Sequence, residues 1–177
     1  AIIVDVENII NALKDKVDLV TLARAREKFN SLSSEGKKFV SNISQLTALE
    51  ATYKSALAVV KQIEAIDPSA KDFVSKTIAA KAAYDKLATD ALKNTVTNYM
   101  IVENYLPIAL IMKEIDAIRV NTAEFRKDYE AAEGTYNALT AGVTGNPENT
   151  PAPTDKVVVA KQRLVTEYGP KIEKFKI

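Results

Sequence analysis

The side chains that could do chemistry in this chain are carboxylates, tyrosines and lysines, because the sequence contains no cysteine and no histidine. Without histidine, the chain lacks the side chain that ordinarily titrates near neutral pH and the commonest metal ligand. Without cysteine, disulfides and thiolate metal sites are excluded. The one nucleophile–base arrangement that can be drawn, Ser33 or Ser34 near Lys37, is better explained as the capping of a helix.

The carboxylates do not form a convincing catalytic pair. Acid–base catalysis needs a carboxyl group whose pKa is raised by burial beside an ionised partner. Only Glu64 and Asp116 flank apolar stripes, and the others fall on polar helical faces, for example Asp5, Glu7, Asp15, Glu130 and Glu133. No D-x-D-x-D-G calcium loop and no Gly-rich phosphate loop occurs. We therefore predict no catalytic, cofactor-binding or metal-binding residues, and no enzymatic activity.

Two sets of residues could bind a ligand. A basic tail could meet an anionic cell-wall polymer, or its lysines could simply be solvated and favoured by a helix dipole; it comprises Lys156, Lys161, Arg163, Lys171, Lys174 and Lys176. Four of the seven tyrosines lie on apolar stripes and are expected to pack between helices: Tyr53, Tyr84, Tyr129 and Tyr136. Tyr99 and Tyr168 are more open and could stack on a glycan.

Charge and hydropathy exclude two classes of partner. The 24 basic and 23 acidic side chains give a net charge of +1, so no field steers the chain onto nucleic acid. The longest apolar run, from Tyr105 to Met112, is far shorter than the ~20 residues that span a bilayer. The chain opens directly in an apolar helical pattern, so we expect a mature form or an excised fragment.

The elements that must position these side chains are all expected to be helices, because apolar residues recur at helical spacing nearly throughout. The first runs from Ile2 to Leu13, and a short helix capped by Ser33 or Ser34 ends near Asn42. From Ile43 to Ile66 neither glycine nor proline interrupts the pattern, which predicts one continuous helix of about 36 Å.

Capping residues and prolines predict where the later helices begin and end. Asp67-Pro68 ends the long helix, and Ser69 is a plausible N-cap for the next one. Pro107 lies inside a second long stripe, where we expect a kink or a break. The segment Asn121-Thr122-Ala123-Glu124 is typical of a capping box.

Three copies of one pattern follow one another along the chain. Ile10-x-Ala12-Leu13 returns as Ile63-x-Ala65-Ile66 and Ile115-x-Ala117-Ile118, at spacings of 53 (63−10) and 52 (115−63). Matching positions follow in each copy: Phe29, Tyr84 and Tyr136, then Leu32, Leu87 and Leu139, then Val40, Val96 and Val165. A period of this size predicts stacked units that bury apolar faces against one another.

The third copy departs from the pattern. Residues 140–154 are rich in Gly, Pro and Asn, which predicts an irregular loop insertion. A last helix is expected from about Asp155 to Glu167, where Gly169-Pro170 interrupts it. The predicted fold is all-α: three tandem three-helix bundles at 1–58, 59–107 and 108–177, fused through long shared helices into an elongated rod.

The first copy carries a motif with a known counterpart. Val6, Ile10, Ala12 and Leu13 are followed by Val20-Thr21-Leu22, by Ala25-Arg26 with Phe29 and Leu32, and then by Val40, Asn42, Leu46 and Glu50. This order resembles a helical repeat of large surface proteins of Gram-positive bacteria, including S-layer-type proteins. The second copy fits the motif fairly well but lacks the Ala-Arg pair, and the third fits only in part.

The resemblance implies an extracellular, non-enzymatic spacer or assembly segment at the cell wall or cell surface. Its partners would be other domains of the same surface protein or neighbouring copies. The alternative is a glycan-binding anchor that uses the basic tail and the exposed tyrosines to hold an anionic wall polymer. A cytosolic helical scaffold also fits the composition.

Overall fold

The computed structural model describes residues 2–144 and 155–176, and within them every regular element is a helix. The predicted all-α class is therefore confirmed. In chain order the elements are α1 (Ile2–Asp15), α2 (Leu19–Ser31), α3 (Ser34–Lys38), α4 (Ile43–Thr52), α5 (Lys54–Glu64), α6 (Phe73–Asp85), α7 (Asp90–Asn94), α8 (Tyr99–Ala117), α9 (Phe125–Thr140), α10 (Lys156–Arg163), the π-helix η1 (Leu164–Tyr168) and α11 (Gly169–Phe175). None of these helices is both long and apolar enough to cross a membrane.

The helices form two compact units. Unit 1 comprises residues 1–65 and 80–100, and unit 2 comprises residues 66–79 and 101–177. Of the three boundaries, one follows α5 and the other two fall within α6 and α8. The helices of the second predicted copy, 59–107, are thus divided between the two units. The division into three repeats remains a prediction about the sequence pattern.

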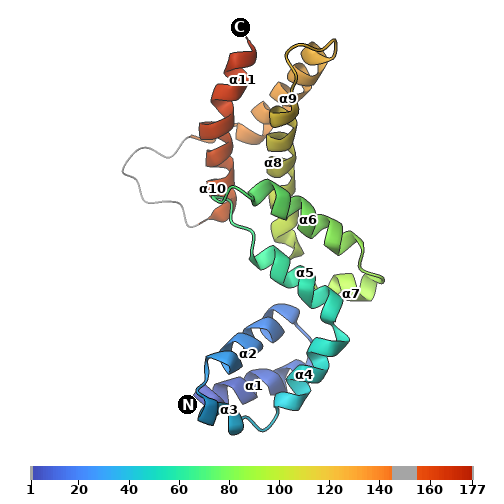
Figure 1. Cartoon of the computed structure of the whole chain (residues 1–177), viewed down its shortest axis with the longest axis vertical. Coiled ribbons are helices and arrows are strands. Elements are labelled where there is room, and N and C mark those ends of the chain that lie inside the picture. Colours follow the sequence, from blue (N-terminus) through green and yellow to red (C-terminus); the bar gives the residue numbers. More distant parts are fainter. Residues whose placement is uncertain (1, 145–154, 177) are drawn as a thin grey trace. The chain divides into compact units, whose positions relative to one another are not determined.

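In unit 1, α1 and α2 pack on each other, and α4 and α5 pack against α2 (Figure 1). The apolar stripe of α1 is buried at Val6, Ile10 and Leu13, spaced as one helical face requires. Asp18 caps α2 by accepting hydrogen bonds from the Val20 backbone N–H at 3.2 Å and the Thr21 hydroxyl at 2.6 Å. This capping explains why α2 begins directly after a three-residue turn.

Two short helices of unit 1 have the same construction, 56 residues apart (90−34). Ser33 caps α3 by accepting from the Gly36 N–H, and Thr89 caps α7 by accepting from the Leu92 N–H. The cap predicted at Ser33 or Ser34 is confirmed at Ser33. The helix it opens is shorter than expected, because α3 ends at Lys38 rather than near Asn42.

Two asparagines then tie the chain back to an earlier helix in the same way. Asn42 Nδ2 donates to the carbonyl oxygen of Glu7 at 2.9 Å, and Asn98 Nδ2 donates to that of Val60 at 3.2 Å. Glu7 and Val60 are 53 residues apart (60−7), which is the spacing of the Ile10 and Ile63 motifs. The two copies therefore share a polar tie as well as an apolar pattern.

The continuous helix predicted from Ile43 to Ile66 is wrong in one respect, because a turn residue, Tyr53, separates α4 from α5. Tyr53 has φ −105° and ψ 22°, outside the usual helical region. The hydrogen bonds nevertheless continue across it: the Tyr53 N–H donates to Leu49 O at 3.0 Å, and the Leu57 N–H donates to Tyr53 O at 2.8 Å. The joint is a local distortion between two helices that remain hydrogen-bonded through it.

The second long stripe forms the single helix α8, which continues through Pro107 without a break. A proline ring removes one helical N–H and crowds the carbonyl four residues earlier, here that of Glu103. Both Pro107 and Glu103 are exposed, so water can satisfy that carbonyl. Beyond Pro107, α8 is deeply buried at Ile108, Ile111, Met112 and Ile115, and this burial holds the helix together.

Unit 2 places α9 against α10 and α11. Two edge-to-face ring contacts of unit 2 resemble each other. Phe73 meets Tyr105 with ring centroids 5.4 Å apart, and Phe125 meets Phe175 with centroids 5.9 Å apart. Phe73 and Phe125 are 52 residues apart (125−73). Each contact joins the start of one helix to a later one, α6 to α8 and α9 to α11.

Three predicted helix boundaries in unit 2 are wrong. Ser69 is not an N-cap, since its N–H donates to Asp67 Oδ1 within a turn and α6 begins only at Phe73. The capping box also fails: Thr122 donates back to the Arg119 carbonyl, and α9 begins at Phe125 with no side-chain cap.

Gly169-Pro170 does not end the last helix either. The wider π-turn η1 precedes it, and Pro170 sits in the first turn of α11, where its missing N–H costs nothing. The predicted start at Asp155 is confirmed, since Asp155 caps α10 by accepting from the Val157 N–H at 2.9 Å. A loop was predicted at residues 140–154. In the structure α9 ends at Thr140 and a turn follows it. Residues 145–154 lie outside the described part of the chain.

Candidate functional site

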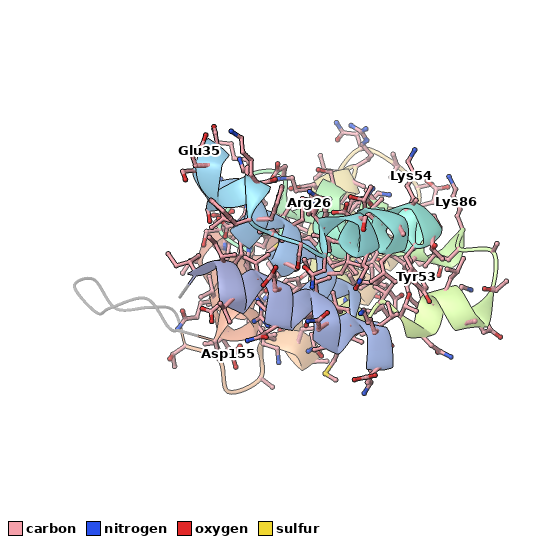
Figure 2. The ribbon with its side chains drawn as sticks, turned by 90° about the horizontal axis from the view of Figure 1, so that it is seen from below. Arg26, Glu35, Tyr53, Lys54, Lys86 and Asp155 are labelled. Carbon is pink, nitrogen blue, oxygen red and sulfur yellow. The ribbon has the colours of Figure 1, made fainter. Side chains whose placement is uncertain are left out.

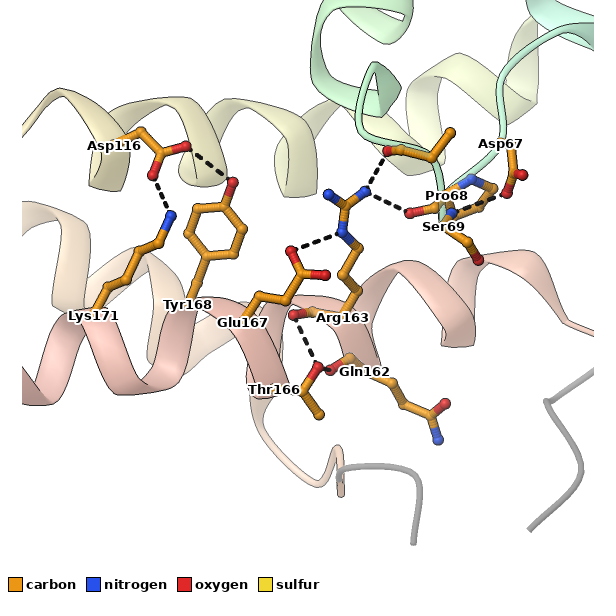
Figure 3. Close-up of polar contacts among 11 residues, drawn as sticks. Asp67, Pro68, Ser69, Asp116, Gln162, Arg163, Thr166, Glu167, Tyr168 and Lys171 are labelled. Carbon is orange, nitrogen blue, oxygen red and sulfur yellow. Dashed lines mark hydrogen bonds and ion pairs between the residues drawn. The ribbon is translucent and has the colours of Figure 1, made fainter. Parts of the chain in front are cut away.

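The densest polar cluster of unit 2 forms around Asp116 of α8 (Figure 3). Asp116 Oδ2 accepts a hydrogen bond from the Tyr168 hydroxyl at 3.0 Å, and Asp116 Oδ1 forms an ion pair with Lys171 Nζ. The ammonium group of Lys171 also lies 4.1 Å from the centre of the Tyr168 ring. One carboxylate of α8 therefore holds both η1 and α11.

Arg163 extends this cluster toward the turn before α6. Its Nη1 donates to the carbonyl oxygens of Pro68 at 2.9 Å and Ala70 at 2.6 Å, and its Nε donates to Glu167 Oε2 at 3.0 Å (Figure 3). A guanidinium group suits this role because its donors point in fixed directions. The two carbonyls come from a turn more than 90 residues earlier, so Arg163 fixes the turn to the terminal helix.

The polar contacts of this cluster hold separate helices and a turn together. Burial, reinforced by the hydrogen bond to Asp116, raises the pKa of Tyr168 to about 12. The hydroxyl therefore stays protonated at neutral pH and acts as a hydrogen-bond donor. Asp116 is paired with Lys171, so its two carboxylate oxygens link η1 and α11 to α8.

The basic tail is partly neutralised within the protein. Arg163, Lys171 and Lys176 all form ion pairs, the last with Glu133 at 3.2 Å and Glu173 at 2.8 Å. Among the described residues, the remaining three cations, Lys156, Lys161 and Lys174, take part in no ion pair. Three of the six cations predicted to bind an anion are therefore used in ion pairs within the protein, and the other three are not.

The tyrosines mostly pack between helices. Tyr53, Tyr84, Tyr129 and Tyr136 are all partly buried, as their place on apolar stripes predicts. Tyr168, expected to be open, is instead buried, because its ring lies under Lys171 and its hydroxyl reaches Asp116. Tyr99 stacks on Tyr84 with ring centroids 3.6 Å apart and planes 10° apart, so one face of its ring is already covered.

A two-point ion pair of unit 1 was not predicted from the sequence. Arg26 of α2 forms a two-point pair with Glu50 of α4, Nε to Oε1 at 2.8 Å and Nη2 to Oε2 at 2.7 Å, and Nη2 also donates to Thr47 Oγ1. In Figure 2, Arg26 lies among the helices, whereas Glu35 projects outward. Both members of the pair belong to the repeat motif, so their opposite charges were the available signal.

The two carboxylates that flank apolar stripes have different environments. Partial burial and then the nearby Glu27 carboxylate raise the pKa of Glu64, while Lys61 lowers it. Asp116 is held by Tyr168 and Lys171. The two lie in different compact units, and nothing in the structure pairs them as an acid and a base. Within residues 2–144 and 155–176, no group of three or more Asp and Glu side chains could hold a metal ion.

Two grooves on the described surface are open to solvent. One, of about 450 Å³, lies in unit 1 between α1 and α3 and is bordered by Ile2, Ile3, Leu32 and Gly36. Another, of about 360 Å³, lies in unit 2 between α9 and α11 around Phe125, Tyr129 and Phe175. Neither contains a buried, unpartnered charge that would fix a small ligand.

No family model, no curated protein and no solved structure matches the chain. The resemblance to surface-protein repeats therefore stays a prediction, supported by the residues of the motif themselves.

Proposed function

We propose that the chain is a non-enzymatic structural module of a secreted bacterial surface protein, built from three helical repeats at 1–58, 59–107 and 108–177. Each repeat would be a three-helix bundle, and consecutive bundles would share a helix. The module would act as a stiff, elongated spacer or assembly segment at the cell surface.

The observation that carries this proposal is the nature of the two joints between copies. α8 runs unbroken from Tyr99 to Ala117 and so contains both the end of the second copy and the Ile115 motif of the third. At the first joint, hydrogen bonds continue from α4 to α5 through Tyr53. A joint made of helix resists bending far better than a flexible linker does.

Matched contacts support the repeat architecture. Ser33 and Thr89 cap equivalent short helices, and Asn42 and Asn98 donate to equivalent carbonyls. The polar residues of the motif thus serve packing and capping. That use fits a structural role better than a catalytic one, which would need such groups to face a pocket.

The alternative role, anchoring to an anionic wall polymer, has less support. Three of the six tail cations are held in ion pairs and Tyr168 is buried. Replacing Lys156, Lys161 and Lys174 with glutamine leaves those ion pairs intact. It is therefore the appropriate variant for a pull-down with purified wall polymer.

Small-angle scattering tests the spacer role. We expect the natural chain to give an elongated particle. The variant Leu57→Pro removes the N–H that donates to Tyr53 O, and we expect it to broaden the distribution of intramolecular distances by loosening the first joint. Leu57→Ala, which keeps this N–H, is the control. A compact natural particle, or a Leu57→Pro profile identical to that of the control, would contradict the proposal.

A further inference from the structure

One face of α1 is exposed although its equivalents in the later copies are buried. The face consists of Ile3, Val4 and Glu7, here called the Val4 face. Counting back six residues from the Ile10, Ile63 and Ile115 motifs, Val4 corresponds to Leu57 and Ala109. Val4 is 55% exposed, whereas Leu57 is 6% and Ala109 0% exposed.

The neighbouring position behaves in the same way. Ile3 is half-buried, whereas its equivalents Ala56 and Ile108 are 0% and 1% exposed. The third position holds Glu7, and its equivalents Val60 and Met112 are both fully buried. The Glu7 carboxylate already accepts hydrogen bonds from the Ser41 N–H and hydroxyl, so this charge has partners within its own copy.

Unit 1 shows what covers this face in the second copy. α5, which carries Leu57, packs against α2 of the preceding copy and follows α4 directly through Tyr53. Partial burial and then the Glu27 carboxylate of α2 raise the pKa of Glu64, which lies two helical turns after Leu57. The occupant of the equivalent face is therefore helix α2 of the copy before it.

The exposed apolar surface around the Val4 face continues beyond α1. Ile2 is 62% and Phe39 is 69% exposed, and the groove of about 450 Å³ lies beside Ile2 and Ile3. In stacked repeats, a terminal unit that ends the array normally presents a polar outer face. The first copy does not present such a face.

The last copy does present a polar outer face, on α9. Phe29 of the first copy and Tyr136 of the third are 107 residues apart (136−29). At the same offset, Ala23 of α2 corresponds to Glu130 of α9. Ala23 is buried, whereas Glu130 is exposed, as are Lys127, Gly134 and Asn137 on the same side of α9. The two ends of the array therefore differ: the outer face of α9 is polar, whereas the outer face of α1 exposes Val4 and part of Ile3 beside the hydrogen-bonded Glu7.

We infer that the Val4 face is a docking surface for another helical repeat of the same kind, whose helix equivalent to α2 would cover Ile3 and Val4. This inference rests on the repeat architecture proposed above. The last helix of that repeat would continue into α1 through a helical joint, as α4 continues into α5 through Tyr53, and at the same spacing.

A tandem protein tests this directly. Residue 54 is equivalent to residue 1 (54−53), so residues 1–53 placed before residue 1 of the full chain reproduce the natural joint. Because the chain has no cysteine, Val4→Cys in the original copy gives a single reactive thiol. We expect its reaction with a thiol reagent to slow by about tenfold or more in the tandem protein relative to the same variant of the natural chain.

Lys14→Cys, exposed at the other end of α1, is the matched control and should react at the same rate in both proteins. An unchanged rate at Val4→Cys in a folded tandem protein would overturn the inference. Slow reaction in the natural chain that recovers on dilution would also overturn it, because a second copy would then be the occupant. Scattering from the natural chain tests the repeat architecture separately, so the two failures can be told apart.

Discussion

The side-chain amide of Asn98 donates to the backbone carbonyl of Val60 at 3.2 Å, and this bond repeats the contact between Asn42 and Glu7. The other amide atom, Asn98 Oδ1, is buried without a hydrogen-bond partner among the described residues, as is Asn42 Oδ1. In both asparagines the hydrogen bonds are therefore made by the amide nitrogen, and Asn42 Nδ2 also donates to Asn11 Oδ1 at 3.1 Å. A residue at this position that cannot donate should be costly.

We expect Asn98→Asp to lower the free energy of unfolding by about 1–3 kcal/mol at neutral pH, because a carboxylate oxygen would face the Val60 carbonyl. Urea denaturation followed by circular dichroism measures the change. Asn8→Asp, on the exposed side of α1, is the control and should stay within about 0.5 kcal/mol of the natural chain. Equal effects in the two variants would show that the Asn98 amide contributes nothing specific.

The two-point pair between Arg26 and Glu50 gives a second prediction. Arg26→Lys keeps the charge but loses the forked geometry, and we expect a loss of about 1 kcal/mol in unfolding free energy. Arg24→Lys, two residues earlier and exposed, is the control and should be neutral. If both substitutions were equally mild, the pair would be an ordinary surface contact.

Pro107 gives a prediction of the opposite sign. Pro107→Ala restores a helical N–H in the interior of α8, and we expect stabilisation by about 1–2 kcal/mol, the helix penalty of proline reduced by its rigidity in the unfolded chain. Pro170→Ala, in the first turn of α11, is the control and should have little effect. Thermal unfolding compares the two, and destabilisation by Pro107→Ala would show that the proline is required for the shape of α8.

The pH dependence of stability should separate two glutamates. Hydrogen bonds from the Ser41 hydroxyl and N–H lower the pKa of Glu7, so its contribution is present above its unfolded-state pKa and is lost as the pH falls through the folded-state value. Partial burial and Glu27 raise the pKa of Glu64, so its stabilising contribution is present at acid pH and is lost as the pH rises.

At neutral pH we therefore expect Glu7→Gln to lower the melting temperature and Glu64→Gln to raise it slightly. The Glu64→Gln difference should disappear below the ordinary pKa of a glutamate, about 4.3. The Glu7→Gln difference should shrink below that value and disappear only below the lowered folded-state pKa of Glu7. Differential scanning calorimetry across this range provides the measurement. A shift of the same sign in the two variants would contradict the assigned environments.

Periodicity and local capping predicted the helical class, the cap at Ser33 and the start of α10 at Asp155 correctly, because these depend on residues within one turn of each other. The turn at Tyr53 and the late starts of α6 and α9 were not predicted. Distant contacts bear on such boundaries. Arg163, for example, holds the turn at Pro68 and Ala70, and nothing near that turn reveals it.

The polar contacts were harder to predict than the helices. Tyr168 was expected to be open, and its partner Asp116 lies 52 residues earlier. The pairing of Arg26 with Glu50 across 24 residues depends on how α2 meets α4. Opposite charges at two motif positions are compatible with many pairings until the helix packing is known.

The wide turn at Leu164–Tyr168 decides where the final helix points its aromatic ring. An α-helix holds about 3.6 residues in each turn, and a π-turn holds more, so η1 accommodates its residues without ending the helix. The rotation at which α11 leaves η1 sets the direction of Phe175, whose ring meets that of Phe125 with centroids 5.9 Å apart.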